Sequence, residues 1–248
     1  TLDEARTFMQ GLPPGSAVMV KALSGGGGRG MRRVATIEEL DAAFATCASE
    51  AAKAFGNDAL YVEQIIPAAR HIEVQIAGDG THAIQLGDRD CSIQRRHQKV
   101  VEIAPSPWLD DAVRRELAQA ALMLARASRY ATLGTFEFLV PLHPEPGAPA
   151  FFFIEANPRL QVEHTVTEEV SGVDLVTTQI RLAAGETLAD LGFGGEHPRL
   201  YPGYAIQLRV LMESMGAGEG CPQGGVFTAF DPPSGPGVRV DTHCSAGY

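Results

Sequence analysis

Short apolar runs and alternating polar positions predict strands along most of the chain. The predicted strands cover residues 18–22, 31–34, 59–63, 70–78, 82–86, 131–140, 150–155 and 204–213. Helical periodicity or capping signals instead mark residues 36–53, 109–129 and 174–185. Short turns such as Asp79-Gly80 predict antiparallel hairpins between neighbouring strands. The sequence therefore predicts an α+β fold built on antiparallel sheet.

The segment 151–164 has the most informative pattern. It begins with three phenylalanines. From Glu155 onward alternate positions are polar or charged, namely Glu155, Asn157, Arg159, Gln161 and Glu163. Alternate side chains of an extended strand share one face. A fully extended stretch from the first to the last of them would span roughly 27 Å, so we expect a bend at Pro158, which cannot donate to a strand ladder. Because the aromatic residues predict a buried strand, these charges indicate a functional site rather than a solvated loop.

A further carboxylate, Glu137, lies between Phe136 and Phe138 in the predicted strand 131–140. If the following connector is symmetric about residues 146–147, a hairpin places Glu137 within one residue of Glu155. Two carboxylates at this separation repel each other, and a divalent cation removes the conflict. Oxygen ligands suit Mg²⁺ or Mn²⁺ better than zinc. We therefore predict a metal site at these two glutamates, with a plain charge at a sheet edge as the alternative for Glu137.

A glycine-rich loop at residues 24–31 follows the first predicted strand. Residues 25–30 formally match G-x-G-x-x-G, but that dinucleotide motif requires a helix directly after it, and Met31 begins a predicted strand. Met31 also stands where a Walker A loop has lysine. Bare N–H groups of such a hairpin can still fold over phosphates, with Lys21 as a point charge. A plain flexible hairpin is the alternative.

Other charged residues stay open on their own evidence. The segment 87–102 is unusually polar for a stretch between strands, and its basic residues could bind phosphates or carboxylates or form a solvated edge. Glu63 could meet a nucleotide base or be an ordinary strand end. Arg209, inside an apolar strand, is either ion-paired for structure or aimed at an anion. By itself, His71 is more typical of a packing histidine.

Composition narrows the classes of function. The 248 residues carry a formal net charge of -10, which argues against non-specific nucleic-acid binding. The four cysteines form no C-x-x-C pair, so neither zinc nor redox chemistry is indicated. The sequence has no long apolar run and no signal peptide, which predicts a cytoplasmic protein with no membrane partner. The chain begins at Thr1 and resembles a piece of something longer.

Four stretches, residues 21–31, 89–102, 134–138 and 155–164, together resemble biotin carboxylase. Biotin carboxylase is the ATP-grasp component of biotin-dependent acyl-CoA, pyruvate and urea carboxylases. The glycine loop and the two glutamates are shared with other ATP-grasp ligases, whereas 89–102 and 159–164 are more specific to carboxylases. The resemblance implies an ATP-grasp fold with a lid at 1–65, a core at 66–200 and the beginning of a C-terminal subdomain at 201–248.

The resemblance also implies a reaction and a set of residues. ATP phosphorylates bicarbonate to carboxyphosphate, and biotin captures the CO₂ that this intermediate releases. The implied ATP-binding residues are Lys21, Gly25, Gly26, Gly27, Gly28, Glu63, Ile65, His71, Gln94 and His97. The implied metal ligands, for Mg²⁺ or Mn²⁺, are Glu137, Glu155 and Asn157, and the implied bicarbonate site is Arg159, Gln161 and Val162. The implied catalytic residues are Glu163 as the base, Lys99 against the transferred phosphoryl group, Arg159, and Arg209 for the biotin enolate.

The chain also departs from this family. It lacks the N-terminal subdomain, its C-terminal subdomain stops early, and the flanks of Arg209 are atypical. We therefore expect the chain alone to turn over weakly or not at all, with a biotin carrier domain and a carboxyltransferase as partners of the parent enzyme. Two alternatives remain. One is another ATP-grasp ligase of carbamoyl-phosphate synthetase or purine-pathway type, against which 89–102 argues. The other is a non-catalytic nucleotide-binding module, against which the intact acidic set argues.

Overall fold

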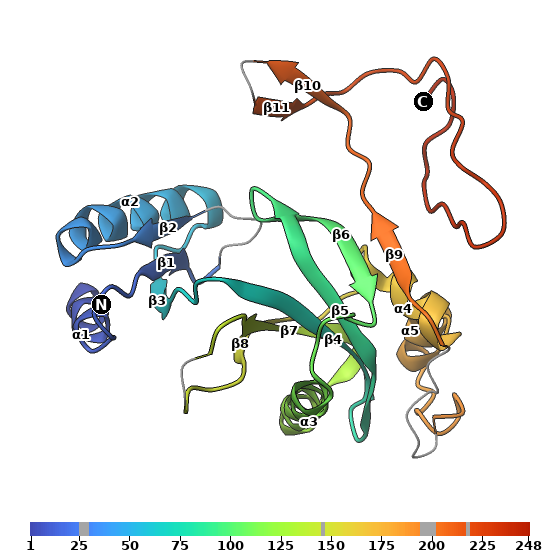
Figure 1. The fold of residues 1–248 in the computed structure, drawn as a ribbon, viewed down its shortest axis with the longest axis horizontal. Coiled ribbons are helices and arrows are strands. Elements are labelled where there is room, and N and C mark those ends of the chain that lie inside the picture. Colours follow the sequence, from blue (N-terminus) through green and yellow to red (C-terminus); the bar gives the residue numbers. More distant parts are fainter. Residues whose placement is uncertain (25–29, 145–146, 194–201, 217–218) are drawn as a thin grey trace. The chain divides into compact units, whose positions relative to one another are not determined.

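The computed structural model describes residues 1–24, 30–144, 147–193, 202–216 and 219–248, and the chain divides into two compact units (Figure 1). The first unit is Thr1–Leu208 and the second is Arg209–Tyr248. The predicted phosphate loop at Gly25, Gly26, Gly27 and Gly28 lies outside the described residues, as does most of the predicted boundary at 192–202. The division into a lid, a core and a third segment stays a prediction.

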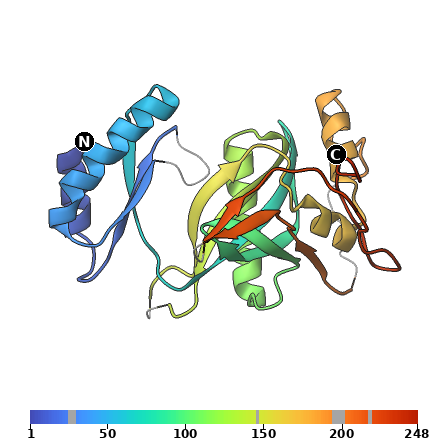
Figure 2. The same ribbon diagram turned by 90° about the horizontal axis from the view of Figure 1, so that it is seen from above.

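A three-stranded antiparallel sheet and two helices begin the first unit. The strands β1 (Val18–Ala22), β2 (Met31–Val34) and β3 (Leu60–Gln64) lie in the order β2-β1-β3. Helices α1 (Leu2–Gln10) and α2 (Ile37–Phe55) pack against one face, as Figure 2 shows. The predicted capping box is present, because Thr36 and Glu39 satisfy each other's backbone N–H groups at the start of α2.

The second sheet has six antiparallel strands in the order β8-β7-β4-β5-β6-β9. Their bounds are Ala69–Asp79 for β4, Ala83–Arg95 for β5, Gln98–Ala104 for β6, Ala131–Pro141 for β7, Phe152–Asn157 for β8 and Ala205–Leu208 for β9. The polar segment 87–102 is therefore part of the sheet rather than a connection between strands. Its two halves are the end of β5 and the beginning of β6, joined by a two-residue turn at Arg96 and His97.

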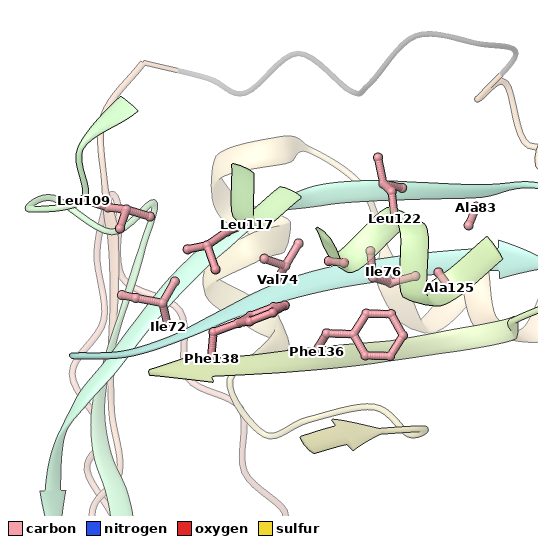
Figure 3. Close-up of a cluster of buried hydrophobic side chains, with 11 residues drawn as sticks. Ile72, Val74, Ile76, Ala83, Leu109, Leu117, Leu122, Ala125, Phe136 and Phe138 are labelled. Atoms are coloured by element: carbon pink, nitrogen blue, oxygen red, sulfur yellow. The ribbon is translucent and has the colours of Figure 1, made fainter. Parts of the chain in front are cut away.

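One face of this sheet packs against helix α3 (Asp111–Ala127). Ile72, Val74 and Ile76 of β4 contact Leu117 and other apolar residues of the helix, as Figure 3 shows. Because side chains alternate along a strand, Glu73 and Gln75 project from the opposite face. Burial of the apolar face thus fixes the direction of the charged residues between these positions.

Helices α4 (His164–Ser171) and α5 (Leu175–Ala183) lie on the face opposite α3, where α4 contacts β5, β6 and β9. The prediction of one continuous strand over 204–213 is wrong, since β9 ends at Leu208. In the second unit, β10 (Glu213–Gly216) and β11 (Glu219–Pro222) form a separate antiparallel pair. Among the described residues, no helix combines the length and the apolar character needed to cross a membrane.

Candidate active site

Three carboxylates lie in register across neighbouring strands. Glu73 of β4 is opposite Glu137 of β7, and Glu137 is opposite Glu155 of β8. The amide of Asn157 joins the last two, since its Nδ2 donates to Glu137 Oε1 at 2.8 Å and to Glu155 Oε1 at 3.1 Å. The prediction that Glu137 and Glu155 lie within one residue of register is confirmed. We call Glu73, Glu137 and Glu155 the carboxylate row.

Lys99 is the cation at the centre of this arrangement. Its Nζ donates to Glu73 Oε2 at 2.7 Å and to Glu137 Oε1 at 2.9 Å. The third acceptor is Glu163 Oε1, also at 2.9 Å. The prediction gave Lys99 a role toward phosphate, and the structure brings it together with the predicted base and one predicted metal ligand.

A bulge in β6 aims Lys99 at this face. Gln94 is opposite Lys99, but Ile93 is opposite Val101, so Val100 is an extra residue in β6. In a regular strand without the bulge, Lys99 would share the face of Val101, two residues further on, which pairs with the exposed Ile93. Bulges of this kind re-aim side chains near active sites. The sequence alone contains no pattern that identifies it.

The charges hold one another ionised. Burial alone would lower the pKa of Lys99, but Glu73 and the other nearby carboxylates outweigh it and raise that pKa. Burial would likewise raise the pKa of Glu137, but its hydrogen bond to His71 and the charge of Lys99 lower it to about 2. Lys99 and Glu137 are therefore both charged at neutral pH. Lys99 needs its charge to bind an anion, and Glu137 needs its charge to bind a cation.

His71 belongs to the site rather than to a packed core. Its Nε2 lies 2.5 Å from Glu137 Oε2, and Gln94 Nε2 lies 2.9 Å from its Nδ1. Since the amide of Gln94 donates, Nδ1 accepts and Nε2 carries the proton toward the carboxylate. Two predicted ATP-binding residues, His71 and Gln94, are thus joined to a predicted metal ligand.

The strand before the bend differs from the prediction. We expected three phenylalanines to bury it, but β8 is an edge strand and Phe153 is 48% exposed. The strand ends at Asn157, so the bend at Pro158 is confirmed. The edge position leaves Glu155 accessible to solvent, which suits a metal ligand better than burial would.

Beyond the bend the predicted polar residues separate. Gln161 is buried, and its Nε2 donates to Thr135 Oγ1 at 3.2 Å and to Glu137 Oε1 at 3.5 Å. Glu163 is fully buried at the N-cap position of α4. Arg159 and Val162 are exposed, and the side chain of Arg159 donates to the carbonyl of Leu160 at 3.2 Å. The expectation of one shared polar face therefore holds for Gln161 and Glu163, whereas Arg159 is turned elsewhere because the chain is no longer extended.

A cavity of about 170 Å³ lies beside the end of β3. It is lined by Glu63, Gln64, Ile66, Leu139, Phe152, Phe153 and Ile154. Glu63, predicted to meet the nucleotide base, is one of these residues and forms an ion pair with Lys21. Ile65 is not among the lining residues, and its neighbour Ile66 takes that place.

Two further predicted residues are His97 and Arg209. His97 is exposed in the turn between β5 and β6 with a φ of 63°, and no hydrogen bond or ion pair ties it to the described part of the site. Arg209 begins the second unit. Their predicted roles stay predictions.

The donor set fits a divalent cation of the Mg²⁺ type. Glu137 and Glu155 supply adjacent carboxylate oxygens, and Asn157 already bridges them. The carboxylate row and Glu163 face two cations, Lys99 and Arg89, so two formal negative charges remain. Ligand atoms of His71, Glu73 and Glu137 also lie within 4.8 Å of one another, but the Lys99 ammonium already bonds to both of those glutamates.

Comparison with known proteins places the chain in a family. Residues 1–191 match the family model described as the ATP binding domain of the carbamoyl-phosphate synthase L chain. The chain belongs to this family, and its fold is the ATP-grasp fold.

Carboxylases are among the relatives that the chain matches over nearly all of its length. The chain is 47% identical to pyruvate carboxylase 1 of Caenorhabditis elegans over 98% of its own length and 20% of that protein. It is 44% identical to biotin carboxylase of a Nostoc species, over 94% of its own length and 50% of that protein. The chain thus spans between a fifth and a half of the length of these relatives.

Solved structures give the same result. A biotin carboxylase complex with β,γ-ATP from Campylobacter jejuni matches all of this chain and 52% of its own, with a TM-score of 0.86 and 40% identity. The biotin carboxylase domain of 2-oxoglutarate carboxylase from Hydrogenobacter thermophilus, in complex with MgADP, ADP and bicarbonate, has a TM-score of 0.87 at 40% identity and the same coverage. The resemblance to biotin carboxylase inferred from the motifs is confirmed.

Proposed function

We propose that this chain carries the ATP- and bicarbonate-dependent step of biotin carboxylation within a larger carboxylase. The observation that supports it most directly is the contact of Lys99 with both the carboxylate row and Glu163. This arrangement unites groups for a metal, for a transferred phosphoryl group and for a base within one hydrogen-bonded cluster. The solved biotin carboxylase domain with MgADP and bicarbonate supports the same chemistry by similarity.

In this proposal the residues divide the work by charge. Glu137 and Glu155, with Asn157 beside them, hold Mg²⁺ or Mn²⁺, which neutralises phosphate charge when bound. Glu163 removes the proton of bicarbonate, and Lys99 stabilises the charge on the phosphoryl group. A bicarbonate oxygen forms the new bond to the γ-phosphorus as the bond to ADP breaks. Carboxyphosphate then releases CO₂ and phosphate, and the ureido nitrogen of biotin bonds to the CO₂ as its proton passes to the released phosphate.

The remaining site residues have proposed binding roles. ATP places its base in the cavity beside β3. Its contacts are Lys21, the glycines at 25–28, Glu63, Ile65, His71, Gln94 and His97. Arg159, Gln161 and Val162 contact bicarbonate, which requires Arg159 to turn inward when the anion arrives. Arg209 acts on the biotin enolate. The parent enzyme would add a biotin carrier domain and a carboxyltransferase, and the cytoplasmic location also stays a proposal.

The experiment is bicarbonate-dependent ADP release, measured at high protein concentration with Mg²⁺, ATP and free biotin. We expect slow release that requires bicarbonate. Glu163→Gln should reduce it on the order of 10²-fold, with the affinity for Mg-ATP changed less than about threefold because the proton acceptor is lost and the nucleotide contacts remain. Release that another carboxylate drives, or that bicarbonate does not affect, would favour a different ATP-grasp ligase and contradict the proposal.

A further inference from the structure

Arg89 is a fully buried guanidinium directly behind the site. Its Nε donates to Glu73 Oε1 at 2.5 Å, and its Nη1 donates to Gln75 Oε1 at 2.9 Å and to Thr167 Oγ1 at 2.7 Å. Its Nη2 is buried without a hydrogen-bond partner. None of the roles proposed above uses this side chain.

A contribution to stability does not by itself explain why a charged side chain is buried at this position. Removing a guanidinium from water is costly, and well-packed apolar replacements of buried ion pairs are often as stable or more stable. A buried donor with no partner adds to that cost. A group retained at such a cost has a different explanation, and its contacts supply one.

Arg89 is linked to two of the three partners of Lys99, to Glu73 directly and to Glu163 through helix α4. Through Glu73 it reaches Lys99, because one oxygen of that carboxylate accepts from Arg89 and the other accepts from Lys99. Through Thr167 it reaches α4, the helix whose N-cap residue is Glu163. One rigid guanidinium therefore ties a strand of the sheet to the helix that carries the proposed base.

We propose that Arg89 is a positioning residue that holds Lys99 and Glu163 in register for phosphoryl transfer. This inference rests on the proposed function. Glu73 shares its negative charge between Arg89 and Lys99. It therefore orients Lys99 without fully neutralising the ammonium, which still attracts an incoming anion. The planar fork suits this task, since it fixes several acceptors in directions that a lysine ammonium does not.

The test compares Arg89→Lys with Arg114→Lys. Arg114 makes similar contacts on the opposite face of the sheet, to Asp88 and to the carbonyl oxygen of Ser106. Arg89→Lys should reduce kcat of bicarbonate-dependent ADP release on the order of 10²-fold, because displacements of about 1 Å have this effect. Its KM for Mg-ATP should change less than about threefold. Arg114→Lys should lower Tm with little change in kcat. The kcat of Thr167→Val should fall between those of Arg89→Lys and Arg114→Lys.

A second readout does not depend on turnover. The ¹⁵N signal of the Lys99 ammonium, assigned by its loss in Lys99→Met, should be observable because three carboxylates shield it from exchange. We expect the signal to move or disappear in Arg89→Lys and to persist in Arg114→Lys. An unchanged signal in Arg89→Lys, with kcat altered no more than in Arg114→Lys, would overturn the positioning role. ADP release by the unmodified chain that bicarbonate does not affect would instead contradict the proposed function, and the ¹⁵N signal would still decide the role of Arg89.

Discussion

Glu73 shows what a single residue position can and cannot reveal. It lies between Ile72 and Val74, as Glu137 lies between Phe136 and Phe138. The second pattern predicted a functional residue at Glu137, whereas Glu73 was not predicted. The same signal, a charge between two buried apolar neighbours in a strand, was present at both positions. Arg89 is different, because its sequence neighbours fit a solvated basic edge as well as they fit a buried cation.

At the residue scale, Asp79 gives a prediction on pH dependence. Burial alone would raise the pKa of its carboxyl, but backbone N–H groups of His82, Leu188 and Thr81 outweigh it and lower that pKa. A lowered pKa in the folded state stabilises the fold above the ordinary value near 3.8 and loses that effect as the pH falls. Asp79→Asn should therefore reduce the free energy of unfolding by about 1–2 kcal/mol at pH 7, with a smaller difference near pH 3.

Urea unfolding of both proteins at the two pH values measures this difference. The exposed Asp58→Asn serves as the control and should change the free energy of unfolding little at either pH. An equal loss in Asp79→Asn at both pH values would show that the hydrogen bonds, and not the charge, make the contribution.

At the scale of elements, hydrophobic patterning predicted most strands and helices but not their irregularities. The hairpin of β7 and β8 followed from its two strands and its turn-rich connector. The length of β5 did not, because its second half has no continuous apolar face and only the fold shows that it pairs with β6. The bulge at Val100 depends on pairing between distant residues, which a local pattern does not encode.

Gly134 in β7 gives the prediction at this scale. An added Cβ would lie 1.9 Å from the hydroxyl of Tyr130 and 2.7 Å from the backbone oxygen of Asn157. Gly134→Ala should therefore destabilise the protein by about 1–3 kcal/mol. It should also weaken Mg-ATP binding, since Asn157 has to move away from the carboxylates that it bridges.

Chemical unfolding and calorimetry of Gly134→Ala supply the two measurements. Gly11→Ala is a matched control, because its added Cβ meets neighbouring atoms at 3.5 Å and its φ of -79° suits alanine. Full affinity for Mg-ATP in a destabilised Gly134→Ala would separate the packing of this strand from the site and contradict the account.

At the scale of the whole molecule, the resemblance supplied what patterning could not. Alternation of polar residues from Glu155 indicated a site, but the partners of that site lie in strands far apart in the sequence. The order of motifs resembling biotin carboxylase predicted which segments meet, and the structure brings Lys99, Glu137 and Glu163 together. The direction of Arg159 was not predictable, because it depends on how the chain turns after Pro158.

Glu137 and Glu155 are proposed to hold the metal of Mg-ATP in this chain, and calorimetric titration with Mg-ATP tests this proposal most directly. Glu155→Gln is the informative variant, since Glu155 is exposed and its loss should leave the fold intact. Glu50→Gln, which alters a surface ion pair with Arg32, is the control. The account predicts binding to one site, weakened by about tenfold or more in Glu155→Gln and unchanged in Glu50→Gln. Equal affinity in all three proteins, or no binding by the folded unmodified chain, would contradict it.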